Sequence, residues 1–201
     1  MKNTKLKNSP KILGLDVSTR TIGVALFDIK SQELLELTHV SPVPKPKQEN
    51  KIYELILKSE IFKIKLEEYK DLGITNVVIE EPLLNSNNIY TVQTLLRYNS
   101  FITKQIYDTL EIVPEFISTY NSRKFAFPEL VKENDKGKFV LFGGMPKDID
   151  KKMIIWEKVA KKEPQITWGY TKNNTLKKEN FDMTDAYCCV LGFMRKEGVW
   201  K

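Results

Sequence analysis

The sequence is poor in cysteine and histidine, the residues that crosslink small secreted domains or bind structural zinc. It has two cysteines in 201 residues, and these two, Cys188 and Cys189, are adjacent. Two neighbouring cysteines are too few and too close for a disulfide framework or a zinc knuckle. The single histidine, His39, falls on a strand expected at the outside of a sheet, and we interpret it as structural. Cytoplasmic residence is therefore the default expectation.

Long apolar runs are also missing. No segment approaches the roughly 18 apolar residues that a membrane span requires, so we expect no membrane association. Residues 1–10 contain lysines but no apolar stretch followed by a small-residue cleavage site, so they are predicted to form a basic tail and not a secretory signal. Residues 11–201 are predicted to form a single domain, long enough to bury a substantial core.

Acidic residues are outnumbered by basic ones, and most of the basic residues are lysines. The formal net charge is +6 and the isoelectric point is near 9.1. This balance favours an anionic partner such as nucleic acid, because lysines at phosphates release condensed counterions. A protein that is merely soluble and basic would show the same balance, and the charge alone does not separate the two.

The N-terminal third predicts three strands joined by short connections. Apolar segments at 12–17, 21–28 and 33–40 are separated by a few polar residues each. Connections this short allow only an antiparallel meander.

The rest of the chain alternates helical and strand patterns, and it includes a loop at 164–180 in which 166–170 could begin a small hairpin. Crossover helices make the later strands parallel. The pattern predicts an α/β fold with a mixed five-stranded sheet, a three-strand antiparallel meander plus two parallel strands, flanked by helices on both faces. The predicted strands are 76–80 and 112–118, and the predicted helices are 51–70, 89–110, 123–132 with an interruption at Pro128, 147–162 and 182–196.

Two carboxylates stand at the ends of apolar strands. Asp16 follows Ile-Leu-Gly-Leu, and Glu80 follows Val-Val-Ile. An ionised carboxylate in such a strand is costly to bury unless a cation compensates it. Neighbouring strands of an α/β sheet end at the same edge, where ligands bind. We therefore expect Asp16 and Glu80 to converge.

A second pair of acids, Asp182 and Asp185, opens the last predicted helix. Residues three apart on a helix face the same way, and the helix N-terminus favours their negative charge. Together with Asp16 and Glu80 they form a set of four hard oxygen ligands suited to Mg²⁺ or Mn²⁺.

Each of these acids also has a simpler interpretation. Asp16 could begin a turn, Glu80 could lie on a strand end exposed to solvent, and the last pair could be an acidic helix start. Their shared position at element ends, in the order that one fold requires, favours a common site.

The segments around the four acids share a pattern with a known family. They are GLDVSTRTIGVA at 14–25, VIEEP at 78–82 and DMTDAY at 182–187. The first resembles the motif G-[IL]-D-x-[GS]-x-x-x-x-G-[VW]-[AG] of RuvC-like Holliday-junction resolvases of bacterial or phage type, which have the ribonuclease-H-like fold. The other two are similar to the second motif of this family and to its final D-x-x-D-A motif. The resemblance covers about residues 11–195.

This resemblance implies a metal-dependent, structure-specific endonuclease for DNA recombination and repair. It would resolve four-way (Holliday) or branched DNA junctions by symmetric phosphodiester hydrolysis, with two Mg²⁺ or Mn²⁺ ions held by Asp16, Glu80, Asp182 and Asp185. Symmetric nicking of two strands implies a homodimer. The family often carries a neutral residue where this chain has Glu81. Strand alternation points Glu80 and Glu81 to opposite faces, and the motif favours Glu80 as the ligand.

Basic and amide side chains near the acids are candidates for DNA contacts. Lysines that bind phosphates position DNA without reading its sequence. Against each candidate stands the alternative that a lysine on a helix is only solvated. The candidates are Lys151, Lys152, Arg123, Lys124, Arg97 and, by the resemblance, Asn87.

Three other functions share parts of this pattern. A YqgF-like nuclease of the same fold, acting on RNA or other DNA structures, is barely separated by the motifs. An actin-like or sugar-kinase-like ATPase has a first phosphate loop that resembles 14–19, but it needs two such domains, and Gly143-Gly144 lacks the strand and aspartate of a second phosphate segment. A non-catalytic DNA-binding relative would not need all four acids.

Overall fold

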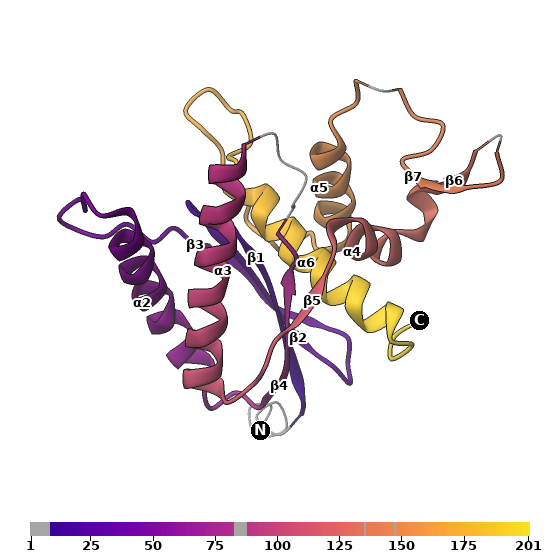
Figure 1. Ribbon diagram of the computed structural model, residues 1–201. Coiled ribbons are helices and arrows are strands. Elements are labelled where there is room, and N and C mark those ends of the chain that lie inside the picture. Colours follow the sequence, from indigo (N-terminus) through magenta and orange to yellow (C-terminus); the bar gives the residue numbers. More distant parts are fainter. Residues whose placement is uncertain (1–8, 83–87, 135, 147) are drawn as a thin grey trace.

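A five-stranded mixed sheet forms the centre of the computed structural model, which describes residues 9–82, 88–134, 136–146 and 148–201. The strand order is β3-β2-β1-β4-β5 (Figure 1). Strands β1, β2 and β3 are antiparallel to one another, whereas β4 runs parallel to β1 and to β5. The predicted sheet is therefore confirmed. The strands are β1 (Lys11–Val17), β2 (Ile22–Asp28), β3 (Leu34–Val40), β4 (Ile74–Glu80) and β5 (Glu115–Ile117).

Helices cover both faces of this sheet, as Figure 1 shows. One face packs against α2 (Lys51–Tyr69) and α3 (Ile89–Leu110), and the other against α4 (Thr119–Ala126), α5 (Lys151–Lys162) and α6 (Glu179–Lys196). None of the described helices is long and apolar enough to cross a membrane.

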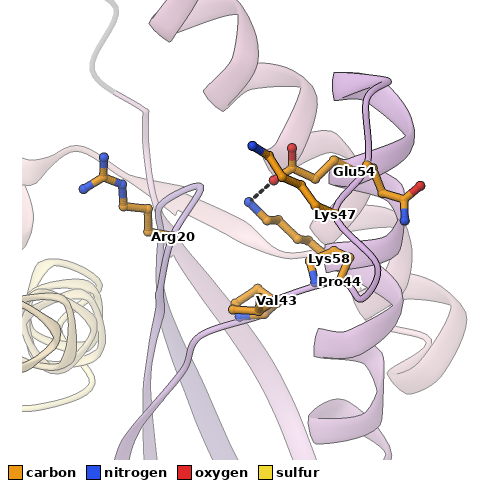
Figure 2. A pocket seen from close by; sticks show the side chains of 8 residues that line it. Arg20, Val43, Pro44, Lys47, Glu54 and Lys58 are labelled. Atoms are coloured by element: carbon orange, nitrogen blue, oxygen red, sulfur yellow. Dashed lines mark ion pairs between the residues drawn. The ribbon is translucent and has the colours of Figure 1, made fainter.

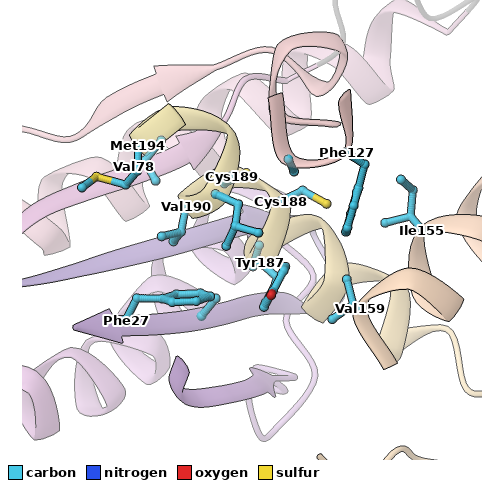
Figure 3. Close-up of a cluster of buried hydrophobic side chains, with 14 of the residues drawn as sticks. Phe27, Val78, Phe127, Ile155, Val159, Tyr187, Cys188, Cys189, Val190 and Met194 are labelled. Carbon is cyan, nitrogen blue, oxygen red and sulfur yellow. The ribbon is translucent and has the colours of Figure 1, made fainter. Parts of the chain in front are cut away.

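Strand alternation divides the hydrophobic core into two layers. On β1, Leu13 and Leu15 are buried with the residues of α2 and α3, whereas Ile12 is buried with those of α6. Figure 3 shows the second layer, in which Phe27 of β2 lies beside Tyr187 of α6 with ring centroids 5.2 Å apart. The two free cysteines are buried there as well. They therefore act as small apolar side chains.

Two glycines allow α6 to lie directly on the sheet. A Cβ atom at Gly14 would lie 2.5 Å from the carbonyl oxygen of Ala186, and one at Gly23 would lie 2.0 Å from that of Asp182. Both distances are too short for any side chain, so only glycine permits this approach. Gly23 is also the cross-strand partner of Asp16. The same contact therefore brings the start of α6 to the end of β1.

The prediction of a helix at 123–132 was wrong about both ends of the helix. Helix α4 begins at Thr119, because the Ser118 hydroxyl caps it by accepting from the amide of Asn121. It ends at Ala126, and a 3-10 turn, η1 (Pro128–Leu130), follows. The remaining residues enter a small two-stranded sheet that the sequence pattern did not indicate, formed by β6 (Val131–Glu133) and β7 (Phe139–Leu141).

The last two helices also begin at residues other than the predicted ones. Helix α5 begins at Lys151, because the Asp150 carboxylate accepts from the amides of its first turn. Its predicted start, residue 147, lies outside the described residues. Helix α6 begins at Glu179, three residues before the predicted start. The predicted strand 112–118 shrinks to three residues, since it pairs only with the last residues of β4. The expected hairpin at 166–170 is a loop with one bridge, between Tyr170 and Leu176.

Replacing Gly23 by alanine should destabilise the protein strongly, because the added methyl group meets backbone atoms that cannot rotate away. We expect the free energy of unfolding to fall by about 3 kcal/mol, measured by urea unfolding. The control is Gly169→Ala, whose Cβ would meet only side-chain atoms, the nearest being Cδ of Lys177 at 3.3 Å. Equal losses in the two variants would contradict the assigned role of Gly23.

Candidate active site

Asp16 and Glu80 lie side by side at the carboxyl edge of the sheet. Strands β1 and β4 are parallel neighbours, and their register pairs Leu15 with Ile79, so the next residue of each strand is an acid. The sequence prediction that these two carboxylates converge is confirmed in this respect. They line a common hollow of about 400 Å³.

Helix α6 brings the other two acids to the same hollow. Asp182 lies in its first turn, and Asp185 follows one turn later with only 4% of its surface exposed. Because α6 rests on Gly23, its N-terminal part stands beside the end of β1. All four predicted acids therefore line one hollow, together with residues from α3, α4 and α5.

Two cations hold Asp185. The guanidinium of Arg123, on α4, donates from Nη2 at 2.7 Å and from Nε at 3.2 Å to Oδ1 of Asp185. Lys152, on α5, places its Nζ 3.7 Å from Oδ2 of the same carboxylate. Burial by itself would lower the pKa of Arg123, but the adjacent Asp185 outweighs it and raises that pKa. Arg123 is thus a buried partner of an acid, whereas Lys152 is half exposed at the rim.

Glu80 has one satisfied oxygen and one unsatisfied oxygen. The Thr119 hydroxyl donates to Oε1. Oε2 is buried and has no hydrogen-bond partner among the described residues. A buried carboxylate oxygen without a partner is costly unless a cation or a proton reaches it. Thr119 was missed by sequence analysis, although its position directly after a parallel strand next to β4 was a usable signal.

Burial and repulsion by neighbouring acids raise the pKa values of Asp16, Glu80 and Asp182. Burial raises the pKa of Asp16 well above its ordinary value, and repulsion by Glu80, Asp185 and Asp182 adds to this effect. Burial and then Asp185 raise the pKa of Glu80 to about 7. Burial, with a contribution from Asp185, raises that of Asp182 to about 6. A carboxylate cluster of this kind holds protons near neutral pH unless more positive charge arrives.

The donor set fits a divalent cation. Five carboxylates line the hollow, the four predicted acids and the exposed Glu81, together with two cations, so three negative charges remain when all the groups are ionised. Carboxylate oxygens are the ligands that Mg²⁺ and Mn²⁺ prefer. Among the described residues no three acidic, histidine or cysteine side chains are already arranged around one metal position. Asp185 turns to Arg123 and Lys152 instead.

Three of the other predicted DNA-binding residues lie outside the acidic hollow. In the part of the chain that the structure describes, Lys151, Lys124 and Arg97 do not line the acidic hollow. Lys151 stands 5.8 Å from the ring of Phe142, and Lys124 lies over Tyr120 and Phe125. Arg97 is exposed on α3, and Asn87 falls outside the described residues.

Solved structures of Holliday-junction resolvases share this fold. RuvC of Thermus thermophilus covers 94% of this chain and 97% of its own length, with 12% identity and a TM-score of 0.55. The structure of T. thermophilus RuvC in complex with a Holliday junction substrate gives 9% identity, coverage of 94% and 96%, and a TM-score of 0.56. The yeast mitochondrial Holliday junction resolvase Ydc2 is 11% identical and covers 94% of this chain and 79% of its own length, with a TM-score of 0.60.

No protein-family model and no curated protein sequence matches the chain. At these identities the likeness concerns the backbone and not the side chains. The chain therefore has the fold of the RuvC and Ydc2 resolvases, as its motifs predicted.

The raised pKa of Glu80 predicts how the stability of the metal-free protein depends on pH. Between 4.5, its ordinary value, and about 7, the unfolded chain loses this proton while the folded protein keeps it. The folded state then binds more protons, so stability falls as the pH rises through this window and levels off above it.

Asp16→Asn removes one source of repulsion. We expect it to raise the free energy of unfolding at neutral pH by about 1–3 kcal/mol and to flatten the pH dependence, measured by urea unfolding in EDTA. The control is Asp148→Asn, an exposed aspartate outside the hollow. A variant at Asp16 that is no more stable than the wild type would refute the electrostatic account.

Proposed function

We propose that this protein is a metal-dependent, structure-specific endonuclease that cuts four-way or branched DNA by phosphodiester hydrolysis. The observation that carries the proposal is the convergence of Asp16, Glu80, Asp182 and Asp185 in one hollow at the carboxyl edge of the sheet. The shared backbone supports it as well, because one of the similar structures is a resolvase bound to a Holliday junction substrate.

The acids are the residues that would hold divalent ions, Mg²⁺ or Mn²⁺, two per site. When bound, such ions supply Lewis-acid stabilisation of the attacked phosphate and of the departing oxygen. Asp16 stands between Glu80 on β4 and Asp182 on α6, so it would hold ions together with both of these acids. The buried, unpartnered Oε2 of Glu80 is the oxygen with most to gain from a cation.

The cations beside the acids have a separate role. Arg123 orients Asp185 through two hydrogen bonds to one oxygen, which leaves the other oxygen facing Lys152 and the hollow. Lys152 is half exposed, so its ammonium can move from Asp185 to a phosphate of the substrate. Thr119 fixes Glu80 by the hydroxyl that donates to Oε1.

Symmetric cutting of two strands calls for a homodimer.

Cleavage of labelled nucleic acids tests this function. With Mg²⁺ or Mn²⁺ the wild-type protein should place paired, symmetric nicks in a four-way junction, and EDTA should abolish them. Glu80→Gln should lower the cleavage rate at least about 100-fold. Losing a residue that only hydrogen-bonds to a metal ligand can already lower activity by up to about 100-fold, and Glu80 is proposed to be a ligand itself. Glu81→Gln, which alters the exposed acid next to Glu80 in the lining of the same hollow, should retain far more activity.

Linear duplex and RNA–DNA hybrid serve as comparison substrates. Cleavage of the hybrid in place of the junction would keep the metal nuclease and refute the assigned substrate. If Glu81→Gln is the inactive variant and Glu80→Gln is active, the ligand assignment is wrong. A protein that cuts none of the three substrates with either metal would refute the catalytic proposal.

Binding of Mg²⁺ should also stabilise the fold without any substrate. Ions that bind only the folded state raise the free energy of unfolding, by about 2.7 kcal/mol at 100 times the dissociation constant. Thermal unfolding with Mg²⁺, compared with K⁺ at equal ionic strength, should show an increase that Asp16→Asn abolishes. An equal increase in the variant would show that the ion binds elsewhere.

A further inference from the structure

A continuous series of hollows leads from the acids to the N-terminus of α2. The acidic hollow shares Ser18, Lys152 and Asp182 with a second hollow of about 530 Å³. That hollow in turn shares Arg20 with a third one, of about 380 Å³. We call these three hollows together the edge groove. The turn between β1 and β2, residues 18–21, forms the link between its two ends.

This turn is held rigid from both sides. The Ser18 hydroxyl accepts from the amide of Thr21 and donates to its carbonyl oxygen, at 3.0 and 2.8 Å. From α2, Lys58 donates to the carbonyl oxygen of Thr19 at 2.9 Å and pairs with Glu54 at 2.8 Å. Arg20 is therefore presented to solvent from a fixed backbone.

The third hollow combines an apolar floor with a basic rim. Figure 2 shows Arg20 on one side of the hollow, with its guanidinium turned away from α2 in this view, and Val43, Pro44 and Lys47 on the side of α2. Val43 is 66% exposed, because nothing in the described part of the chain covers it. An exposed apolar surface beside positive charge is the kind of surface on which a nucleobase rests while its phosphate is neutralised.

The positive charge on this rim is available to a ligand. Lys58 is occupied by Glu54 and Thr19, but among the described residues neither Arg20 nor Lys47 forms an ion pair within 4.0 Å. The first amides of α2 are likewise occupied, because the Asn50 side chain accepts from them. A phosphate in this hollow would therefore be held by Arg20 and Lys47.

The middle hollow supplies the connection. It is lined by Lys152, Lys178 and Arg20, which outnumber the acids Glu179 and Asp182. Phe181 also lines it, and Lys152 stands 5.9 Å from its ring centroid. Basic groups interleaved with one ring again suit a nucleic-acid strand.

We propose that the edge groove guides one unpaired strand of the DNA substrate away from the acids, over Arg20, to a nucleotide site formed by Val43, Pro44 and Lys47. The proposal rests on the proposed nuclease function and adds to it the path of the strand beyond the point of cleavage. A single strand fits because the apolar floor of the third hollow, at Val43 and Pro44, would contact a base face, which in a duplex is stacked inside the helix.

Binding of a fluorescent four-way junction, measured by anisotropy in the Asp16→Asn background without divalent ions, tests the path. Arg20→Ala and Lys47→Ala should each weaken binding about three- to tenfold at low salt. Each should also lower the slope of log affinity against log salt by about 1, because one phosphate contact is lost. The matched control is Lys30→Ala, an exposed basic residue in the β2–β3 turn at the opposite end of the same sheet.

Photocrosslinking provides the second readout. Single 4-thiothymidines placed along one strand near the branch point should crosslink to the peptide containing residues 42–48 from at least one position, and Arg20→Ala should weaken that crosslink. Thermal unfolding confirms that the variants are folded.

The outcomes separate the two proposals. If Arg20→Ala and Lys47→Ala bind like Lys30→Ala and no crosslink reaches residues 42–48, the strand path is refuted, while junction binding by Asp16→Asn keeps the nuclease proposal intact. If Asp16→Asn binds no nucleic acid at all, both proposals fail.

Discussion

Helix α6 and strands β1 and β2 approach so closely that only glycine hydrogens separate their backbones at two points, Gly14 and Gly23. The presence of all four predicted acids in one hollow depends on this contact. Asp16 and Glu80 are adjacent because their strands are hydrogen-bonded neighbours. Asp182 and Asp185 belong to a helix more than 100 residues away in sequence, and they join the first pair only because that helix can rest on the sheet. A single methyl group at Gly23 would push them apart.

That close approach creates an electrostatic cost. Five carboxylates line one hollow. Burial together with repulsion by neighbouring acids raises the pKa values of Asp16, Glu80 and Asp182. Arg123 and Lys152 offset part of this cost at Asp185. The remaining negative charge is the physical reason to expect divalent ions, since a cluster that is unfavourable alone becomes favourable when cations bind. Stability and function are therefore opposed at this edge of the sheet.

The same edge also explains the shape of the basic surface. The β1–β2 turn begins one residue beyond β1, so it lies beside the acids, and the ties from Ser18 and Lys58 hold it against α2. Arg20 thus stands between the acidic hollow and the hollow at α2. Positive charge in this protein is not spread evenly around the acids. Lys151, Lys124 and Arg97, which sequence analysis grouped with them, lie elsewhere.

The sequence by itself determined the sheet, the major helices and the identity of the four acids. Apolar alternation and helical periodicity are local properties, so they are legible without the fold; helix 89–110, for example, was predicted with its observed bounds. The motif residues around Asp16 are likewise adjacent in the sequence, and they predicted the fold of the molecule.

Tertiary structure decided what depends on contacts between distant residues. The pairing of Arg123 with Asp185 joins residues 62 positions apart, and that of Thr119 with Glu80 joins residues 39 apart. Neither follows from any periodicity. The starts of α4 and α5 were decided by single capping side chains, Ser118 and Asp150, whose hydrogen bonds outweigh the weak propensities of the flanking residues. The edge groove likewise exists only because three segments remote in sequence meet at one edge of the sheet.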